Sequence, residues 1–254
     1  MSSEPIFVGI DPSGGRKPFS FSALNLDCSP VLLNEGDLDQ VLEFLAENDA
    51  AIVAINAPPR PSQGLVKARL VKEGQSLGSL RGADCRLVEY ELHERGIPVS
   101  NTPSRREMCP SWVQLGFSLY ESLGTLQTRY KPYSTARDAH QLFETHPHAV
   151  FCSLLGLQPL PKSTLEGRLQ RQLILHENGV KIHDPMEFFE EITRYRLLHG
   201  VLPMEILYAS EQLDCLAAAF TAFVAGTHPD QVLLLGDENE GQIVLPTNEL
   251  KQKY

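Results

Sequence analysis

Three acidic residues stand where buried elements of the chain are expected to begin or end. The apolar run at residues 6–10 predicts a buried strand, and Asp11 follows it, directly before a proline and two glycines that turn the chain. Glu144 closes a second predicted strand at residues 141–144. Asp214 lies near the start of residues 210–226, an apolar and alanine-rich segment that predicts a buried helix.

Acids in these positions suit a metal-dependent hydrolase. Two hard divalent cations need several oxygen ligands, and such a pair can activate a water and stabilise the leaving oxygen of a phosphodiester. Carboxylates that come from separate elements and meet at one rim of a sheet would supply those ligands. The alternative is purely local: Asp11 caps the end of its strand, and Asp214 is favoured at a helix start by the helix dipole. The residues alone leave both interpretations open.

The elements around Asp11 predict how it is positioned. Two further strands, at residues 19–26 and 31–33, are joined by short turns and predict an antiparallel meander. Asp37 is a natural N-cap for an amphipathic helix, and a buried strand follows at residues 51–55. A strand that follows a helix in this way favours a parallel crossover beside the first strand. This order predicts an α/β protein with a ribonuclease H-like mixed sheet flanked by helices.

The rest of the chain predicts mainly helices. Residues 1–254 are expected to form a single ribonuclease H-like domain with a helical insertion at about 60–138. The predicted helices span residues 84–94, 112–126, 149–155, 162–178, 184–199 and 210–226, and a final hairpin spans 231–235 and 242–245.

Composition excludes several classes of protein. An apolar content of 42% with 21% charged residues is typical of a globular protein. A net charge of -10 argues against a protein that coats nucleic acid, although a nucleic-acid substrate could still be bound locally. No apolar run approaches the ~18 residues of a membrane span, and the first residues lack the features of a signal peptide. The five scattered cysteines have no C-x-x-C spacing, so we expect reduced thiols in a cytoplasmic protein.

Basic residues could form a rim that binds phosphate groups, because guanidinium groups pair with phosphate in a bidentate manner. The alternative for these residues is solvated helix faces with acidic neighbours. His146 and His148 could bind a transition metal, but no further Cys or His lies nearby in the sequence, which favours local turn packing. The candidates for the phosphate-binding rim are Arg60, Arg81, Lys162, Arg168 and Arg171.

Several short motifs occur together in an order that resembles a known family. They are GIDPSGG, AINAPP, RGAD followed by RGIP, FETHPHAVF, K-x5-R-x2-R and LDCLAAAFTA, with EGQIVLP near the end. In this order they resemble domain-of-unknown-function family number 429, predicted ribonuclease H-like nucleases related to the Holliday-junction resolvase RuvC. The resemblance extends from residue 6 to about residue 246.

The resemblance implies a divalent-metal-dependent nuclease or phosphodiesterase that uses Mg²⁺ or Mn²⁺. The family's four acidic positions correspond here to Asp11, Asn56, Glu144 and Asp214, so an amide stands where the second acid is expected. An amide oxygen can still bind a cation but adds no charge, which should weaken ion binding. The alternative is therefore a catalytically degenerate, non-enzymatic binding module on the same fold. The sequence does not define the substrate, the number of ions or the oligomeric state.

Overall fold

The structure is a computed structural model of the whole chain. It describes residues 4–12, 18–48, 50–74, 83–125, 130–135 and 140–254. None of the helices in these ranges is both long enough and apolar enough to cross a membrane.

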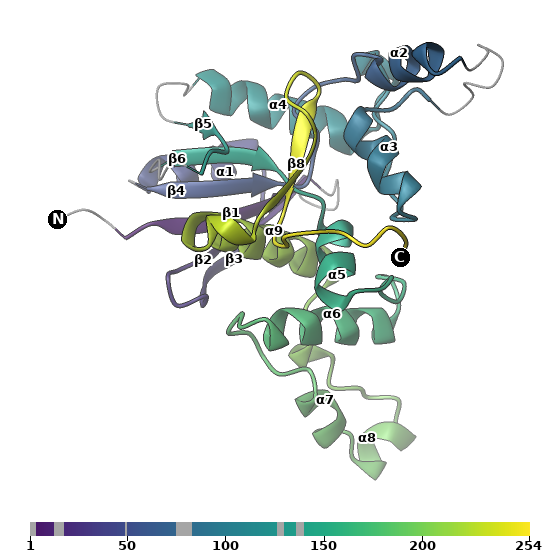
Figure 1. Cartoon of the computed structure of the whole chain (residues 1–254). Coiled ribbons are helices and arrows are strands. Elements are labelled where there is room, and N and C mark those ends of the chain that lie inside the picture. The colour runs from purple at the N-terminus through teal and green to yellow at the C-terminus, as the bar shows by residue number, and fades with distance from the viewer. Residues whose placement is uncertain (1–3, 13–17, 49, 75–82, 126–129, 136–139) are drawn as a thin grey trace.

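An eight-stranded mixed sheet organises the described part of the chain (Figure 1). Its order is β3-β2-β1-β4-β6-β8-β7, with β5 paired to β6 outside this path. β1, β4, β6 and β8 run parallel, whereas β2, β3 and β7 are antiparallel to their neighbours. The predicted mixed α/β fold is confirmed, and the relation to ribonuclease H stays a prediction. The strands are β1 (Ile6–Asp11), β2 (Phe19–Leu24), β3 (Pro30–Gly36), β4 (Ala51–Ile55), β5 (Lys131–Pro132), β6 (His140–Glu144), β7 (Leu233–Asp237) and β8 (Gly241–Leu245).

Helices cover both faces of the sheet, because successive strand residues point to opposite sides. Val8 and Ile10 of β1 pack in one core with α1 (Leu38–Glu47) and α4 (Ser111–Thr125). Phe7 packs in the other core with α5 (Pro147–Leu155), α6 (Leu165–Glu177) and α9 (Ser210–Thr227). We call these two sides the α4 face and the α9 face.

Gly9 allows α9 to pack directly on β1. A Cβ atom at this position would lie 2.0 Å from the carbonyl oxygen of Cys215 and 2.2 Å from the backbone nitrogen of Ala219. Both atoms belong to the α9 backbone, which a side chain at position 9 would have to displace. The close contact fixes α9 over the sheet, so that Asp214 lies beside the end of β1.

The predicted insertion at about 60–138 lies between β4 and β6. It contains α2 (Leu65–Lys72), α3 (Leu87–Glu94), the 3₁₀ helix η2 (Arg106–Met108), α4 and β5. A fully buried carboxylate, Glu240 in the β7–β8 turn, joins the starts of two of these helices. Glu240 accepts backbone hydrogen bonds from Gln63 (2.7 Å), Leu65 (3.2 Å) and Leu87 (2.7 Å). Its negative charge lies at two helix N-termini, where the helix dipole favours an anion.

Two helix predictions need correction. The single helix predicted at 184–199 is wrong: α7 (Glu187–Glu190) and α8 (Arg194–Leu198) are separate, and the Thr193 side chain caps the second. These two helices lie farthest from the sheet in Figure 1, and the 3₁₀ helix η3 (Met204–Ile206) follows them in the chain. The helix predicted from residue 162 begins at Leu165 with Thr164 as its N-cap, so Lys162 lies in the preceding turn.

Candidate active site

The carboxyl ends of β1, β4 and β6 meet at one rim of the sheet. Ile10 pairs with Ile55 between β1 and β4, and Ile55 pairs with Glu144 between β4 and β6. The ladder continues one residue further, since Asn56 N donates to Ile10 O (2.8 Å) and Thr145 N donates to Ile55 O (2.9 Å). The residues level with Asp11 are therefore Asn56 and Thr145, and Glu144 lies one position earlier.

This offset of one residue separates the predicted site residues. Asp11 lies two and four residues after Gly9 and Phe7 in β1, so its side chain points to the same side of the sheet. That side is the α9 face, where Asp214 lies. Glu144 lies two residues after Leu142 in β6, so the two side chains point to the same side of the sheet. Leu142 packs with Ile10 and Ile55 on the α4 face. The structure thus brings Asp11, Asn56 and Asp214 together and places the Glu144 side chain on the opposite side of the sheet.

Asp11 and Asp214 are each 4% exposed, and each carboxylate accepts a hydrogen bond from one donor among the described residues. Asn56 Nδ2 donates to Asp11 Oδ1 at 2.7 Å, and Lys162 Nζ donates to Asp214 Oδ2 at 2.6 Å. The second oxygen of each carboxylate accepts no hydrogen bond from any described residue. Two buried acids thus share one ammonium group, and each keeps one oxygen available.

The electrostatics of the pair follow from this shortage of positive charge. Burial, and after it the negative charge of Asp214, raise the pKa of Asp11 from its ordinary 3.8 to about 7, against the lowering effects of Asn56 and Lys162. Burial also raises the pKa of Asp214, although Lys162 and Arg171 oppose that shift. An additional cation between the two acids would favour their ionised forms.

A cavity of about 320 Å³ opens beside this pair. We call it the carboxylate cavity. Burial lowers the pKa of both His146 and His148 to about 4, so both rings are neutral at pH 7. His146 Nε2 donates to Pro98 O at 3.2 Å, and His148 Nε2 is buried without a partner among the described residues. The cavity is lined by Asn56, Pro98, His146, Pro147, His148, Pro161, Lys162, Arg171 and Asp214.

The basic residues predicted to bind phosphate do not form one rim. Lys162 and Arg171 line the carboxylate cavity, but Arg171 is only 2% exposed and donates to the carbonyls of Leu160 and Gly167. Arg168 donates from Nε and Nη2 to the carbonyls at positions 208 and 207, and it does not line the carboxylate cavity. Arg60 lines a different cavity, and Arg81 lies outside the described residues.

Glu144 forms a buried ion pair with Arg86, which the sequence analysis did not single out. Arg86 donates from Nη1 and Nη2 to the two oxygens of Glu144, at 2.6 Å each, and from Nε to Glu89 at 2.8 Å. All three side chains are at most 5% exposed. Both oxygens of Glu144 are therefore used to hold the insertion against β6. Nothing in the sequence linked positions 86 and 144, which are 58 residues apart.

The atoms available as metal ligands decide which ion the carboxylate cavity could bind. No group of three or more His, Cys, Asp or Glu side chains in the described ranges is placed to hold a metal ion. Asp11 Oδ2, Asp214 Oδ1 and the amide oxygen of Asn56 remain available. Mg²⁺ commonly binds through one or two carboxylates and takes its other oxygens from water and substrate phosphates. The residues therefore fit one divalent ion, and they do not fit an ion pair shared with Glu144.

The comparisons with known proteins identify the family of this chain and give no information on its activity. No curated protein matches the chain, and neither does any solved structure. The model of the family described as "Protein of unknown function (DUF429)" matches residues 31–240. That match covers β3 through the β7–β8 turn, including Asn56, Glu144 and Asp214. Since it spans most of the sequence, the chain belongs to the DUF429 family.

Proposed function

We propose that this protein is a divalent-metal-dependent phosphodiester hydrolase of the ribonuclease H-like type, with nucleic acid as its substrate class. One observation carries the proposal: two buried carboxylates, from β1 and α9, meet beside a cavity, and among the described residues each keeps one oxygen available and the pair has one ammonium group. Buried acids without compensation are costly, so such a pair is retained where a cation is to be bound.

The residues take distinct roles in this proposal. Asp11 and Asp214 would hold one Mg²⁺ or Mn²⁺ ion, and Asn56 fixes the orientation of Asp11 through its 2.7 Å hydrogen bond. When bound, the ion supplies Lewis-acid polarisation of the phosphoryl group and lowers the pKa of water. Lys162, whose side chain is 53% exposed, would contact a non-bridging phosphate oxygen at the cavity mouth. Glu144 has no role in catalysis here and serves the packing of the insertion.

The test joins metal binding to cleavage. Calorimetry with Mn²⁺ should give one ion per chain, and branched DNA, single-stranded DNA and RNA–DNA hybrids should be assayed with Mn²⁺ or Mg²⁺. Asp11→Asn and Asp214→Asn should each lower cleavage at least ~100-fold, because each removes a ligand charge. Asp230→Asn, at an exposed position in the 3₁₀ helix η4 (Pro229–Gln231), is the matched control. Absence of both ion binding and cleavage would overturn the proposal.

A non-catalytic binding module is the second candidate, and two observations favour it. Position 56 carries an amide, and Lys162 already forms an ion pair with Asp214. In this case nucleic acid would bind without being cleaved, and Mn²⁺ would not change its affinity. Titration of a labelled, non-cleavable strand with and without Mn²⁺ separates the two candidates, since only the hydrolase requires the ion.

A further inference from the structure

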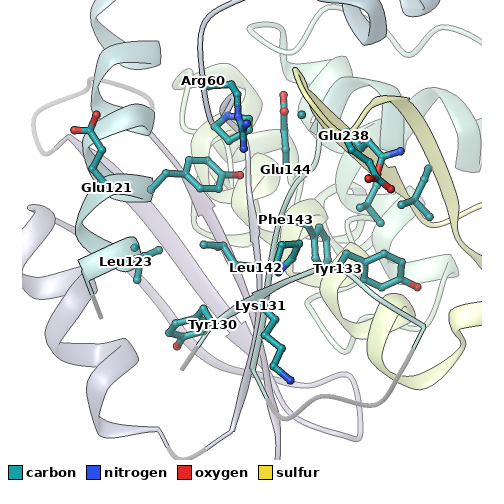
Figure 2. Close-up of a pocket in the computed structure, with 18 residues that line it drawn as sticks. Arg60, Glu121, Leu123, Tyr130, Lys131, Tyr133, Leu142, Phe143, Glu144 and Glu238 are labelled. Carbon is teal, nitrogen blue, oxygen red and sulfur yellow. The ribbon is translucent and has the colours of Figure 1, made fainter. Parts of the chain in front are cut away.

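A second and larger cavity, of about 1030 Å³, lies near the diverging strands β6 and β8 (Figure 2). Within the described residues β6 and β8 pair at Glu144 and Ile243 alone, and α4, β5 and the β7–β8 hairpin contribute the other walls. It shares no lining residue with the carboxylate cavity. We call it the aromatic cavity. Its size is at the upper end of the ~300–1,000 Å³ that is usual for small-molecule sites.

The walls of this cavity are rich in aromatic rings. Tyr120, Tyr130, Tyr133 and Phe143 line it, and Tyr133 packs edge-on against Phe143 with ring centroids 5.4 Å apart. Leu123, Leu142 and Val244 supply apolar surface between the rings. Aromatic side chains arranged in this way offer faces on which a flat heterocycle can stack.

Two phenol groups in these walls lack partners within the described part of the chain. The hydroxyl oxygens of Tyr120 and Tyr133 are buried, and neither makes a hydrogen bond to a described residue. Burial raises the pKa of both phenols, so each stays protonated and can donate as well as accept. A buried hydroxyl without a partner costs free energy, which a ligand with polar edge atoms would recover once a small shift of the ring opens the hydroxyl to the cavity.

The charged groups of the aromatic cavity have a clear arrangement. Figure 2 shows Arg60 and Glu144 at one end and Tyr130 and Lys131 at the other. Glu144 shares Arg86 with Glu89, and Glu121 of the lining is paired with Arg106, so among the described residues Glu238 is the acid of the lining without an ion pair. The only hydrogen bond of the exposed Arg60 in the described residues is a 3.3 Å contact to the carbonyl of Asn239. A guanidinium group with spare donors at the mouth suits a phosphate group.

We propose that the aromatic cavity binds a nucleotide. The base stacks among the tyrosines, its polar edge bonds the hydroxyls of Tyr120 and Tyr133, and the phosphate contacts Arg60. A purely apolar ligand would leave both hydroxyls unpaired, and a sugar phosphate would leave the aromatic walls unused. The site stands apart from the proposed hydrolase centre because the two cavities share no residue.

Calorimetry with defined probes tests this site. AMP, GMP, CMP and UMP are compared with adenosine, which lacks the phosphate, and with ribose 5-phosphate and inorganic phosphate, which lack the base. We expect at least one nucleotide to bind, adenosine to bind ~10-fold more weakly, and the two probes without a base to show no binding. Tyr133→Phe and Tyr120→Phe, which remove only a hydroxyl, should each weaken nucleotide binding about 5-fold.

Two more variants assign the contacts. Arg60→Gln should weaken nucleotide binding but leave adenosine binding unchanged, and Asp11→Asn should leave both unchanged. Binding of ribose 5-phosphate or phosphate as tight as that of the nucleotides would overturn the proposal, as would absence of nucleotide binding or full affinity in both Tyr→Phe variants. Retained nucleotide binding in a protein that neither binds Mn²⁺ nor cleaves nucleic acid would reject the proposed hydrolase alone.

Discussion

Asn56 donates a 2.7 Å hydrogen bond from Nδ2 to Oδ1 of Asp11, across the ends of two neighbouring parallel strands. The Asn56 amide donates a hydrogen bond to Asp11, whereas a carboxylate at position 56 would repel the Asp11 carboxylate. It lowers the pKa of Asp11, although burial and Asp214 outweigh that effect. The same residue therefore stabilises the metal-free site and limits the charge that the site can offer to a cation.

Asn56→Asp should exchange stability for ion affinity. The new carboxylate replaces a donor to Asp11 with a like charge, so the metal-free variant should melt several degrees lower at pH 8. Mn²⁺ affinity should rise about 10-fold or more, since ligand charge sets ion affinity. Calorimetry and thermal melting with and without Mn²⁺ measure both effects. Asn56→Ala, which loses the hydrogen bond without adding charge, is the control, and equal affinity in the two variants would contradict the prediction.

The stability of the metal-free protein should fall as pH rises from about 4 to about 7. Folded Asp11 has a pKa near 7 and an ordinary aspartate one of 3.8, so within this window the folded state retains a proton that the unfolded chain releases. The stabilisation is complete below pH 4 and lost above pH 7. Asp11→Asn should therefore melt higher than the natural protein at pH 8, by ~2–4 °C for each kcal/mol recovered, with no such gain at pH 4. Melting curves across this range would refute the idea if the two proteins stayed parallel.

Removing Arg86 should cost more stability than removing the charge of Glu144. Arg86→Met leaves two buried carboxylates, Glu144 and Glu89, without their cation, whereas Glu144→Gln leaves Arg86 paired with Glu89. Breaking a buried ion pair costs about 3–5 kcal/mol, and we expect Arg86→Met at or above that range and Glu144→Gln below it. Urea unfolding measures both. Mn²⁺ affinity should be unchanged in Glu144→Gln, and a large loss there would return Glu144 to the metal site.

Lys162→Met should separate ion binding from catalysis. Without the ammonium group at 2.6 Å, Asp214 has more charge to offer, so Mn²⁺ should bind more tightly, by about 3- to 10-fold. Cleavage at saturating Mn²⁺ should nevertheless fall ~10-fold or more if Lys162 contacts the phosphate. Lys181→Met, at an exposed lysine outside the cavity, is the control. Weaker Mn²⁺ binding in Lys162→Met would show that the lysine supports the ion site instead of competing with it.

The elements that carry the site could be predicted from the sequence. Apolar runs that end in Asp11, Asn56 and Glu144 are three parallel strands in the structure, and the alanine-rich segment around Asp214 is the helix α9 packed against them. Local patterns were sufficient here because short apolar runs next to glycine or proline favour strands, whereas a longer apolar and alanine-rich run favours a helix. Asp37 likewise caps α1 as its position indicated.

The relative register of those strands could not be predicted. A shift of one residue moves a side chain to the other face of a sheet, and the sequence of β6 alone does not reveal its alignment with β4. This is why Glu144 faces the α4 side while Asp11 faces α9. Arg86 was missed because its partner is distant in the sequence. The break between α7 and α8 could not be predicted from apolar periodicity, because Phe188 is the one buried residue in the two helices.

Glu240 joins the C-terminal hairpin and the insertion into one cooperative unit, although these segments are far apart in the sequence. One carboxylate in the β7–β8 turn accepts the amides of Gln63, Leu65 and Leu87, so the turn cannot open without releasing the starts of both α2 and α3. In hydrogen-exchange experiments, those three amides should therefore lose their protection together, with one opening free energy. The C-terminal hairpin and the insertion would then unfold locally as a single body, although more than 150 residues separate Leu87 from Glu240.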